Sequence, residues 1–357
     1  MKFGIFLPNG SNGYIPSKAT PIYLPTFEHN KEISVEAEKY GFDFVLSMMK
    51  FRGFGGETGY WDACLESFTL MAAIAAVTKK IGLFPSISLL SQHPAYVART
   101  MSTLDDISQG RCGLNIVTGW NKPEYVQMGL WRGDEYYEQR YEYAAEYLTI
   151  MRGLWKDGRV THHSDFFDLE DCMCLPTPKH DIPIVCAGQS PRGKQFVAEM
   201  GDRQFVMTDV NALEASVKDI NERASSVNRK VGIYALFHMI VADSDEAAQE
   251  EAQRIVDNPD DGALNNILAS ANLDTNQGGT SDQLKAGLSQ SIEDGNLAFM
   301  GIPCLHGSPQ TIAKRIKEIE AQTGIDGMLF SWPDFVQGVR DFGQKVMPLL
   351  SAGANRG

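Results

Sequence analysis

Short apolar runs alternate along the chain with longer segments in which apolar residues recur at helical spacing. The apolar runs occupy residues 3–8, 42–48, 81–90, 112–117, 183–187, 203–208, 230–242 and 327–332. The helical segments that follow them occupy residues 25–40, 64–80, 93–108, 137–155, 191–201, 212–227, 244–256 and 333–350. Strands that read as continuous apolar runs, each followed by a helix, are typical of a parallel sheet covered by helices. Eight such units predict an α/β fold, most simply a (β/α)8 TIM barrel.

Two long segments, 156–182 and 258–305, interrupt this alternation. The second is polar, rich in Gly, Asn and Ser, and helix-poor in part. Loops of this length are usually lids or binding loops, so we expect one barrel domain over residues 1–357 with insertions after strands four and seven. The second insertion is expected to form a mobile cover over the active face. A doubly wound open sheet is the alternative, but the turn after the first strand lacks its usual G-x-G-x-x-G fingerprint.

Charge and composition limit the classes of partner that the protein is expected to bind. The chain carries 32 basic and 45 acidic residues, a net charge of -13, without a basic run. Nucleic acid and anionic membranes are therefore not expected as partners. No signal-peptide pattern or membrane-length apolar stretch occurs, which predicts a cytoplasmic protein. Isolated cysteines among apolar or small neighbours are expected to be free thiols, namely Cys64, Cys112, Cys186 and Cys304.

One cluster raises the question of a metal. Cys172 and Cys174 follow His162 and His163 within the first insertion, but C-x-C lacks the usual spacing of zinc ligands. We interpret the segment as a β-hairpin and expect no metal.

A second motif concerns phosphate. Residues 188–194 fit G-x-x-x-x-G-K, yet Gln195 stands where a nucleotide-triphosphate loop needs Ser or Thr to hold magnesium. An NTPase is therefore disfavoured. The segment can still place a phosphate without magnesium at a helix N-terminus.

The predicted strand ends carry the remaining candidates, because chemistry in such barrels gathers there. Asn115 lies inside an apolar strand, where an amide is costly unless it is hydrogen-bonded. The loop 118–125 then brings an aromatic ring, a carboxylate and an amide together, where a flat ring could stack. A satisfied core asparagine is the alternative. A non-catalytic binding protein is disfavoured, because polar and aromatic groups concentrate at the strand ends.

These stretches carry a family resemblance. Residues 42–62 (FDFVLSMMKFRGFGGETGYWD), 113–131 (GLNIVTGWNKPEYVQMGLW) and 185–190 (VCAGQS) are similar to the bacterial-luciferase-like family of flavin-dependent monooxygenases. Within that family the chain most closely resembles the pyrimidine monooxygenases of uracil degradation, over nearly its full length. Related sulfone and haloaromatic monooxygenases share the barrel and N-V-T/S-G-W, whereas KPEY and CAGQS point to the pyrimidine branch.

The resemblance implies a set of site residues. It implies that FMN is bound by Met49, Lys50, Asn115, Glu124, Arg140, Tyr141 and Ser190. Ser190 would hold the phosphate, and Arg192 and Lys194 either add charge there or are solvated. An oxygen slot would be lined by Leu46, Ser86 and Asn115, and the pyrimidine would be oriented by Trp120 and Glu124.

The resemblance also implies the chemistry. FMN would be reduced by a separate NADH-dependent flavin reductase, because the chain has no nicotinamide fingerprint, and would react with O2 to a flavin peroxide. Attack at C4 of uracil or thymine would cleave N3–C4 and give a ureidoacrylate-type product. Open alternatives are a sulfone, haloaromatic or other heterocyclic substrate, or a deazaflavin-dependent reductase. His93 departs from the family pattern and would change the substrate if it pointed into the barrel mouth. Family members commonly form homo-oligomers.

Overall fold

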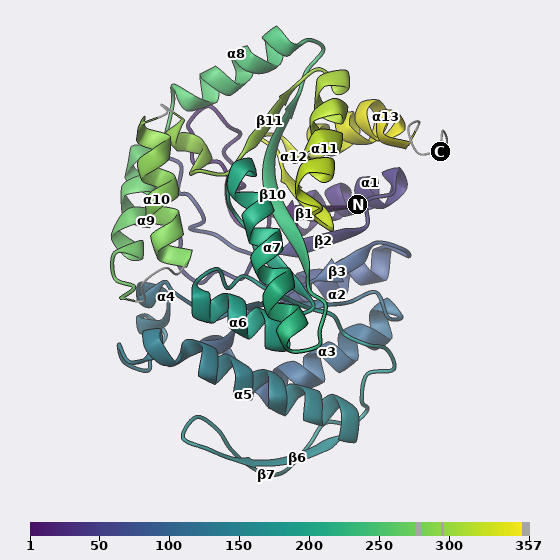
Figure 1. Ribbon diagram of the computed structural model, residues 1–357, viewed down its shortest axis with the longest axis vertical. Helices are drawn as coiled ribbons and strands as arrows, with labels where there is room; N and C mark the ends of the chain where they lie inside the picture. The colour runs from purple at the N-terminus through teal and green to yellow at the C-terminus, as the bar shows by residue number, and fades with distance from the viewer. Residues whose placement is uncertain (276–279, 294–295, 352–357) are drawn as a thin grey trace.

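A closed parallel barrel forms the centre of the molecule (Figure 1). The computed structural model describes residues 1–275, 280–293 and 296–351. The barrel strands are, in spatial order, β3 (Gly82–Phe84), β2 (Phe44–Ser47), β1 (Lys2–Leu7), β12 (Gly327–Ser331), β10 (Gly232–Val241), β9 (Arg203–Val206), β8 (Ile184–Cys186), β5 (Leu114–Val117) and β4 (Ser86–Ser88). The two ends of this order, β3 and β4, are parts of one predicted strand on either side of Pro85, which lacks an N–H. The barrel is therefore closed, as predicted.

Helices surround the sheet (Figure 1). They are α1 (Phe27–Tyr40), α2 (Ser67–Val77), α3 (Pro94–Ser108), α4 (Lys122–Val126), α5 (Tyr136–Asp157), α6 (Pro191–Met200), α7 (Val210–Ser226), α8 (Asp245–Val256), α12 (Phe335–Asp341) and α13 (Met347–Ser351), with a π-helical turn between the last two. Side-chain oxygens cap several of their N-termini, for example Ser190 on α6 and Asp209 on α7. No helix in the described ranges is long and apolar enough to cross a membrane.

Alternate residues of each strand enter two different cores. Phe44, Phe205 and Leu329 belong to a cluster inside the barrel. Leu114 and Ile116 belong to the larger core between the strands and the helices. Because Asn115 lies between these two outward-facing residues, its side chain faces the barrel interior.

Residues 258–305 contain more regular structure than expected. They form α9 (Asp261–Ala271), α10 (Thr280–Glu293), a 3-10 turn η2 (Leu297–Phe299) and the start of β11 (Cys304–Gly307), which pairs with β10 beside the barrel path. The segment had been expected to be helix-poor in part, and its helices had not been predicted; α11 (Pro309–Thr323), which follows, was not predicted either. Helices α9 and α10 pack against each other at one side of the molecule (Figure 1).

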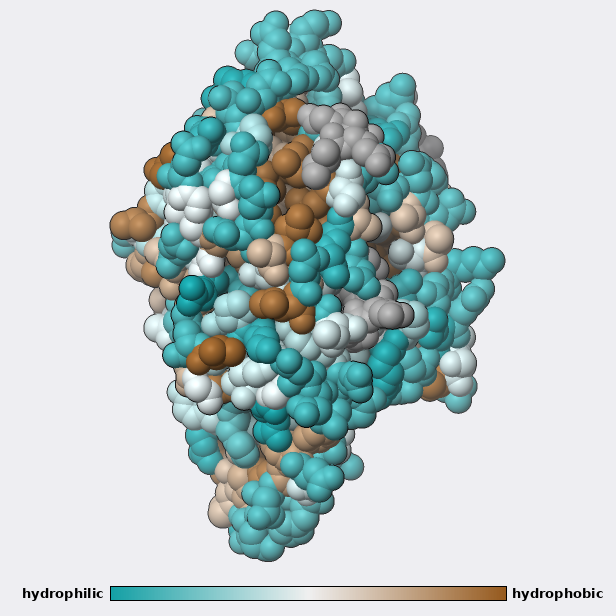
Figure 2. Space-filling view, turned by 90° about the vertical axis from the view of Figure 1, so that its left-hand side faces the viewer, coloured by the Kyte–Doolittle hydropathy of each residue, from teal (hydrophilic) through white to brown (hydrophobic). Residues whose placement is uncertain are grey.

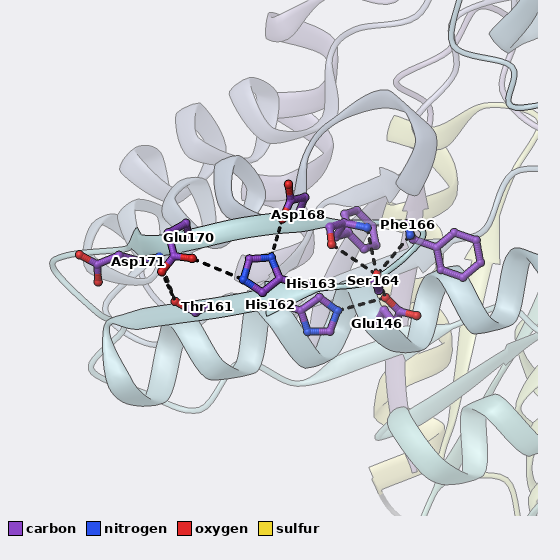
Figure 3. Close-up of polar contacts among 10 residues, drawn as sticks. Glu146, Thr161, His162, His163, Ser164, Phe166, Asp168, Glu170 and Asp171 are labelled. Atoms are coloured by element: carbon purple, nitrogen blue, oxygen red, sulfur yellow. Dashed lines mark hydrogen bonds and ion pairs between the residues drawn. The ribbon is translucent and has the colours of Figure 1, made fainter.

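Residues 156–182 contain the predicted hairpin, formed by β6 (Arg159–His163) and β7 (Asp168–Met173) alongside α5 (Figure 3). His162 contacts Glu146 at 3.1 Å, while His163 lies 2.5 Å from Asp168 and 3.4 Å from Glu170 (Figure 3). The hydrogen bond to Asp168 raises the pKa of His163. Across the described part of the chain, no group of three or more His, Cys, Asp or Glu side chains is arranged to hold a metal ion. All six cysteines are free thiols, which confirms the prediction for the four isolated ones.

Candidate active site

A cavity of about 630 Å³ opens at the C-terminal ends of the barrel strands. Its size is in the range of small-molecule sites. Residues of α9, α10 and the turn after η2 close it from the side opposite the strands, among them Ile267, Leu284 and Met300. Figure 2 views the side of the molecule that carries α9 and α10, where apolar side chains gather in a band on an otherwise hydrophilic surface. The predicted site residues that line the cavity are Met49, Lys50, Ser86, Asn115, Trp120, Glu124, Arg140 and Tyr141.

Strand register brings Ser86 and Asn115 together, because they are directly paired neighbours in β4 and β5. Asn115 Nδ2 donates to Ser86 Oγ at 2.7 Å, and Ser86 Oγ donates to the carbonyl of Ser47 at 2.5 Å. A carbonyl cannot donate, so the Ser86 proton is committed and Ser86 must accept from Asn115. This fixes the amide orientation and leaves Asn115 Oδ1 buried, without a partner among the described residues. An unpaired buried acceptor is costly and is expected to meet a ligand donor.

Lys50 and Glu124 form a buried ion pair beside aromatic rings. Lys50 Nζ lies 3.1 Å from Glu124 Oε2, and the side chains are only 7% and 6% exposed. The ammonium also lies 4.5 Å from the ring centroid of Phe54 and 5.7 Å from that of Trp120, so the rings contribute cation–π attraction. Glu124 Oε1 accepts from the Phe51 N–H at 2.6 Å. Both carboxylate oxygens are thus engaged by the protein.

Arg140 forms a second buried ion pair, with a residue that follows α9. Its Nη1 lies 2.9 Å from Asp274 Oδ2, which also accepts from Ser281 Oγ at 2.6 Å. The two charged side chains are 2% and 0% exposed. Arg140 Nε is buried and has no partner within the described structure. Arg140 therefore lines the cavity with a donor still to be satisfied.

The start of α6 closes tightly on this end of the cavity. Ser190 Oγ accepts from the Gly193 N–H at 2.9 Å. A Cβ at Gly193 would lie 2.5 Å from Tyr141 Oη, and one at Gly188 would lie 2.9 Å from the Gly193 backbone. Only glycine fits at these positions, because the 188–193 turn packs closely on itself and on Tyr141. The N-terminus of α6 carries partial positive charge that favours an anion.

Several residues singled out from the sequence lie outside the cavity lining. Leu46 is buried in the inner barrel core, and Ser190 lies behind Gly188 and Gln189 as the cap of α6. Arg192 pairs with Glu142 at 2.7 Å and Lys194 with Asp219 at 2.7 Å, which agrees with a solvated or surface-paired role.

His93 does not point into the barrel mouth. It caps α3, where its Nδ1 accepts from the Ala95 N–H at 3.2 Å, and it is not among the residues that line the cavity. Partial burial lowers the pKa of its imidazole, which agrees with a ring nitrogen that accepts a hydrogen bond.

Sequence reasoning missed two contributions to the cavity and anticipated a third only in outline. Asn121 lines it from the loop that had been singled out, but no role had been assigned to it. Phe6 and Phe205 reach it from β1 and β9, where they look like ordinary core residues. The residues of α9 and α10 belong to the second insertion, which had been expected to cover the active face, but no single residue of it had been named as part of the site.

Comparison with known proteins identifies the family of the chain. Residues 1–327 match the family model described as luciferase-like monooxygenase. The chain belongs to this family. The pyrimidine monooxygenase RutA of Rhizobium rhizogenes is 43% identical over 98% of this chain and 96% of its own length, and that of Bradyrhizobium sp. is 44% identical over 100% and 99%.

Solved structures agree on the fold. A riboflavin lyase, solved with modified FMN and riboflavin, has a TM-score of 0.87 at 21% identity and covers 99% of this chain and 92% of its own. A long-chain alkane monooxygenase has a TM-score of 0.82 at 21% identity, with the same coverage. As a luciferase-like monooxygenase, the protein is a flavin-dependent enzyme.

Residues of the cavity fit such a cofactor. A flavin nucleotide has ring N–H groups at one end and an anion at the other. The cavity offers the unpaired acceptor of Asn115 to a ring N–H, and it offers the Arg140 guanidinium and the Gly188–Gln189 segment that precedes α6 to an anion.

Proposed function

We propose that this monooxygenase uses reduced FMN and O2 to open the ring of uracil or thymine between N3 and C4, which gives a ureidoacrylate-type product. FMN is reduced by a separate NADH-dependent flavin reductase. The names of the relatives, which this chain matches over 96% and 99% of their length, support the substrate class. The observation that carries the proposal is Asn115, a buried amide held in one orientation by Ser86 at the base of a cavity with an aromatic wall.

Separate groups hold the two ends of FMN in this proposal. Arg140, Tyr141 and the start of α6 at Ser190 take the phosphate, since Arg140 has a buried Nε without a partner among the described residues and a helix N-terminus favours an anion. Met49, Lys50, Asn115 and Glu124 border the ring, with the Lys50–Glu124 pair neutral overall so that no net charge is buried beside it. Arg192 and Lys194 are not needed.

Bound and reduced, the flavin supplies the electrons that activate O2. Asn115 carries a second Nδ2 hydrogen besides the one given to Ser86, and this N–H is a donor for the oxyanion that develops when C4 is attacked. Ser86 acts by orienting Asn115, because its own proton is committed to Ser47. Leu46 packs in the inner core of the barrel. The rings of Phe54 and Trp120 stack with 6.3 Å between their centroids, and they offer a flat face to the pyrimidine and exclude water.

Product analysis tests the function. Purified protein is combined with FMN, NADH, an unrelated flavin reductase and uracil under labelled O2, and the products are identified by mass spectrometry. A ring-opened product with one labelled oxygen is expected.

Other outcomes separate the alternatives. If uracil stays intact while reduced FMN is bound and oxidised by O2, the pyrimidine assignment falls and sulfones or haloaromatics become the substrates to test. Turnover with a reduced deazaflavin in the absence of O2 would point instead to a reductase.

A further inference from the structure

Asn121 is a buried amide that makes none of the hydrogen bonds expected of it. It is 3% exposed and lines the active-site cavity. Its Oδ1 is buried and unpaired, and no described residue shares a hydrogen bond with its side chain. Leaving such an acceptor unsatisfied costs stability, so its retention calls for an explanation.

The position of Asn121 at the start of α4 makes the absence of side-chain hydrogen bonds more unusual. It is the N-cap residue of α4, and an asparagine there normally turns its side chain back to accept from the first turn of the helix. Here the cap bond is not made. The amide is therefore held away from the helix although a local partner was within reach.

Neighbouring polar groups are already occupied. Glu124, one turn along α4, gives one oxygen to Lys50 and the other to Phe51. Tyr125 shares a hydrogen bond with Ser88. Within the described loop 118–125, Thr118 and Asn121 both line the cavity with polar side chains that share no hydrogen bond with described residues. Of the two, only Asn121 carries its donor and its acceptor on separate atoms, so that it can bind two adjacent ligand groups at once.

We propose that Asn121 is the residue that reads the –NH–C(=O)– edge of the substrate ring. Its Oδ1 accepts from the ring N–H, and its Nδ2 donates to the adjacent ring carbonyl. A primary amide and a lactam edge are complementary in this way, as when asparagine pairs with a base edge. The inference rests on the proposed function. It assigns substrate specificity to Asn121 and leaves Glu124 to hold Lys50 and the loop.

Steady-state kinetics with N-methylated substrates tests this. Asn121→Leu keeps the side-chain size without the hydrogen bonds, and Asn121→Gln keeps the amide. Each is assayed with uracil, 1-methyluracil and 3-methyluracil, and the Kd for FMN is measured by fluorescence quenching. Gln127→Leu is the matched control, because Gln127 follows α4, is exposed and donates only to the Phe51 carbonyl.

The expected result is specific to substrate. Asn121→Leu raises KM for uracil by about 10- to 100-fold, while Kd for FMN stays within about 2-fold. Methylation of the nitrogen that Asn121 reads impairs the wild type by a similar factor and impairs Asn121→Leu no further. Asn121→Gln recovers part of the loss, and Gln127→Leu stays near wild type.

Two outcomes overturn the inference, and they differ. If the wild type turns over uracil but Asn121→Leu loses the same factor on all three substrates, or weakens FMN binding instead, Asn121 is structural and the proposed function stands. If the wild type neither binds nor converts uracil, the proposed function falls and this inference falls with it.

Discussion

The barrel wall of the cavity, made by β4 and β5, and the inserted wall, made by the α9–α10 segment, hold their polar groups by different means. On the barrel wall, Asn115, Ser86 and Ser47 form a chain of neutral hydrogen bonds between adjacent strands. On the inserted wall, Asp274 makes a buried ion pair with Arg140, a residue 134 positions away.

The difference concerns how each wall is stabilised. Ladder register determines the barrel wall, so its geometry is present as soon as the strands pair. The inserted wall depends on the buried charges of Arg140 and Asp274. The free-energy cost of burying each charge is offset only while the two are paired. In the proposed function, the oxygen chemistry, which needs a preorganised donor, belongs to the first wall and the anionic end of the cofactor to the second.

The largest effect is expected on the inserted wall. Asp274→Asn leaves the Arg140 charge buried without its counter-charge, so the free energy of unfolding should fall by about 3–5 kcal/mol and the Kd for FMN should rise. Urea unfolding and FMN titration measure the two quantities. The control is Glu142→Gln, which breaks the exposed pair with Arg192 and should cost under about 1 kcal/mol. Equal losses in the two variants would contradict the view that burial makes the inserted wall sensitive.

On the barrel wall, Asn115→Leu should lower kcat by about 10²- to 10³-fold, because one preorganised donor to the oxyanion is lost. Ser86→Ala should have a smaller effect, since it only frees the amide to rotate, and Ser86→Thr should stay near wild type because the hydroxyl is retained. Single-turnover assays with bound reduced FMN measure the step. Retention of kcat within about 3-fold in Asn115→Leu would remove Asn115 from the catalytic role.

Acidity should destabilise the protein through a buried histidine of the barrel. His238 in β10 is buried, hydrogen-bonded to Ser331 at 2.6 Å, and burial lowers its pKa from 6.5 to about 3. The unfolded chain therefore takes up a proton that the folded chain refuses, and stability falls as the pH drops from 6.5 toward 3. Between pH 7.5 and 5.0 this residue should account for about 2 kcal/mol of lost stability. Urea unfolding of wild type and His238→Gln at both pH values measures the difference, and equal pH slopes would contradict it.

The smallest effect is expected outside both walls. Arg192→Ala and Lys194→Ala should change the Kd for FMN by less than about 3-fold, because both side chains are paired with surface carboxylates and neither lines the cavity. Fluorescence titration measures this. A 10-fold or greater loss of FMN affinity in Lys194→Ala would instead show that Lys194 contributes to the phosphate site.

Much of the barrel could be predicted because its signal is local. A buried parallel strand needs a run of apolar residues, and such runs mark each barrel strand, with Pro85 alone splitting the third into β3 and β4. Asn115 could be singled out for the same reason, as an amide in an apolar run. Helices α9 and α10 escaped prediction because Asn265, Asn266 and Ser270 dilute the apolar period that Leu264 and Ile267 carry.

By itself the sequence determined the strand–helix alternation, the candidate residues at the strand ends and, through long matching stretches, the family. Only the tertiary structure decided which atoms those residues keep free. Strand register commits the Ser86 proton to Ser47 and orients Asn115, the inserted helices bring Asp274 to Arg140, and Asn121 forgoes its cap bond. These hydrogen-bond partners depend on distances between residues that are far apart in the chain. The local pattern of apolar and polar residues therefore does not predict them.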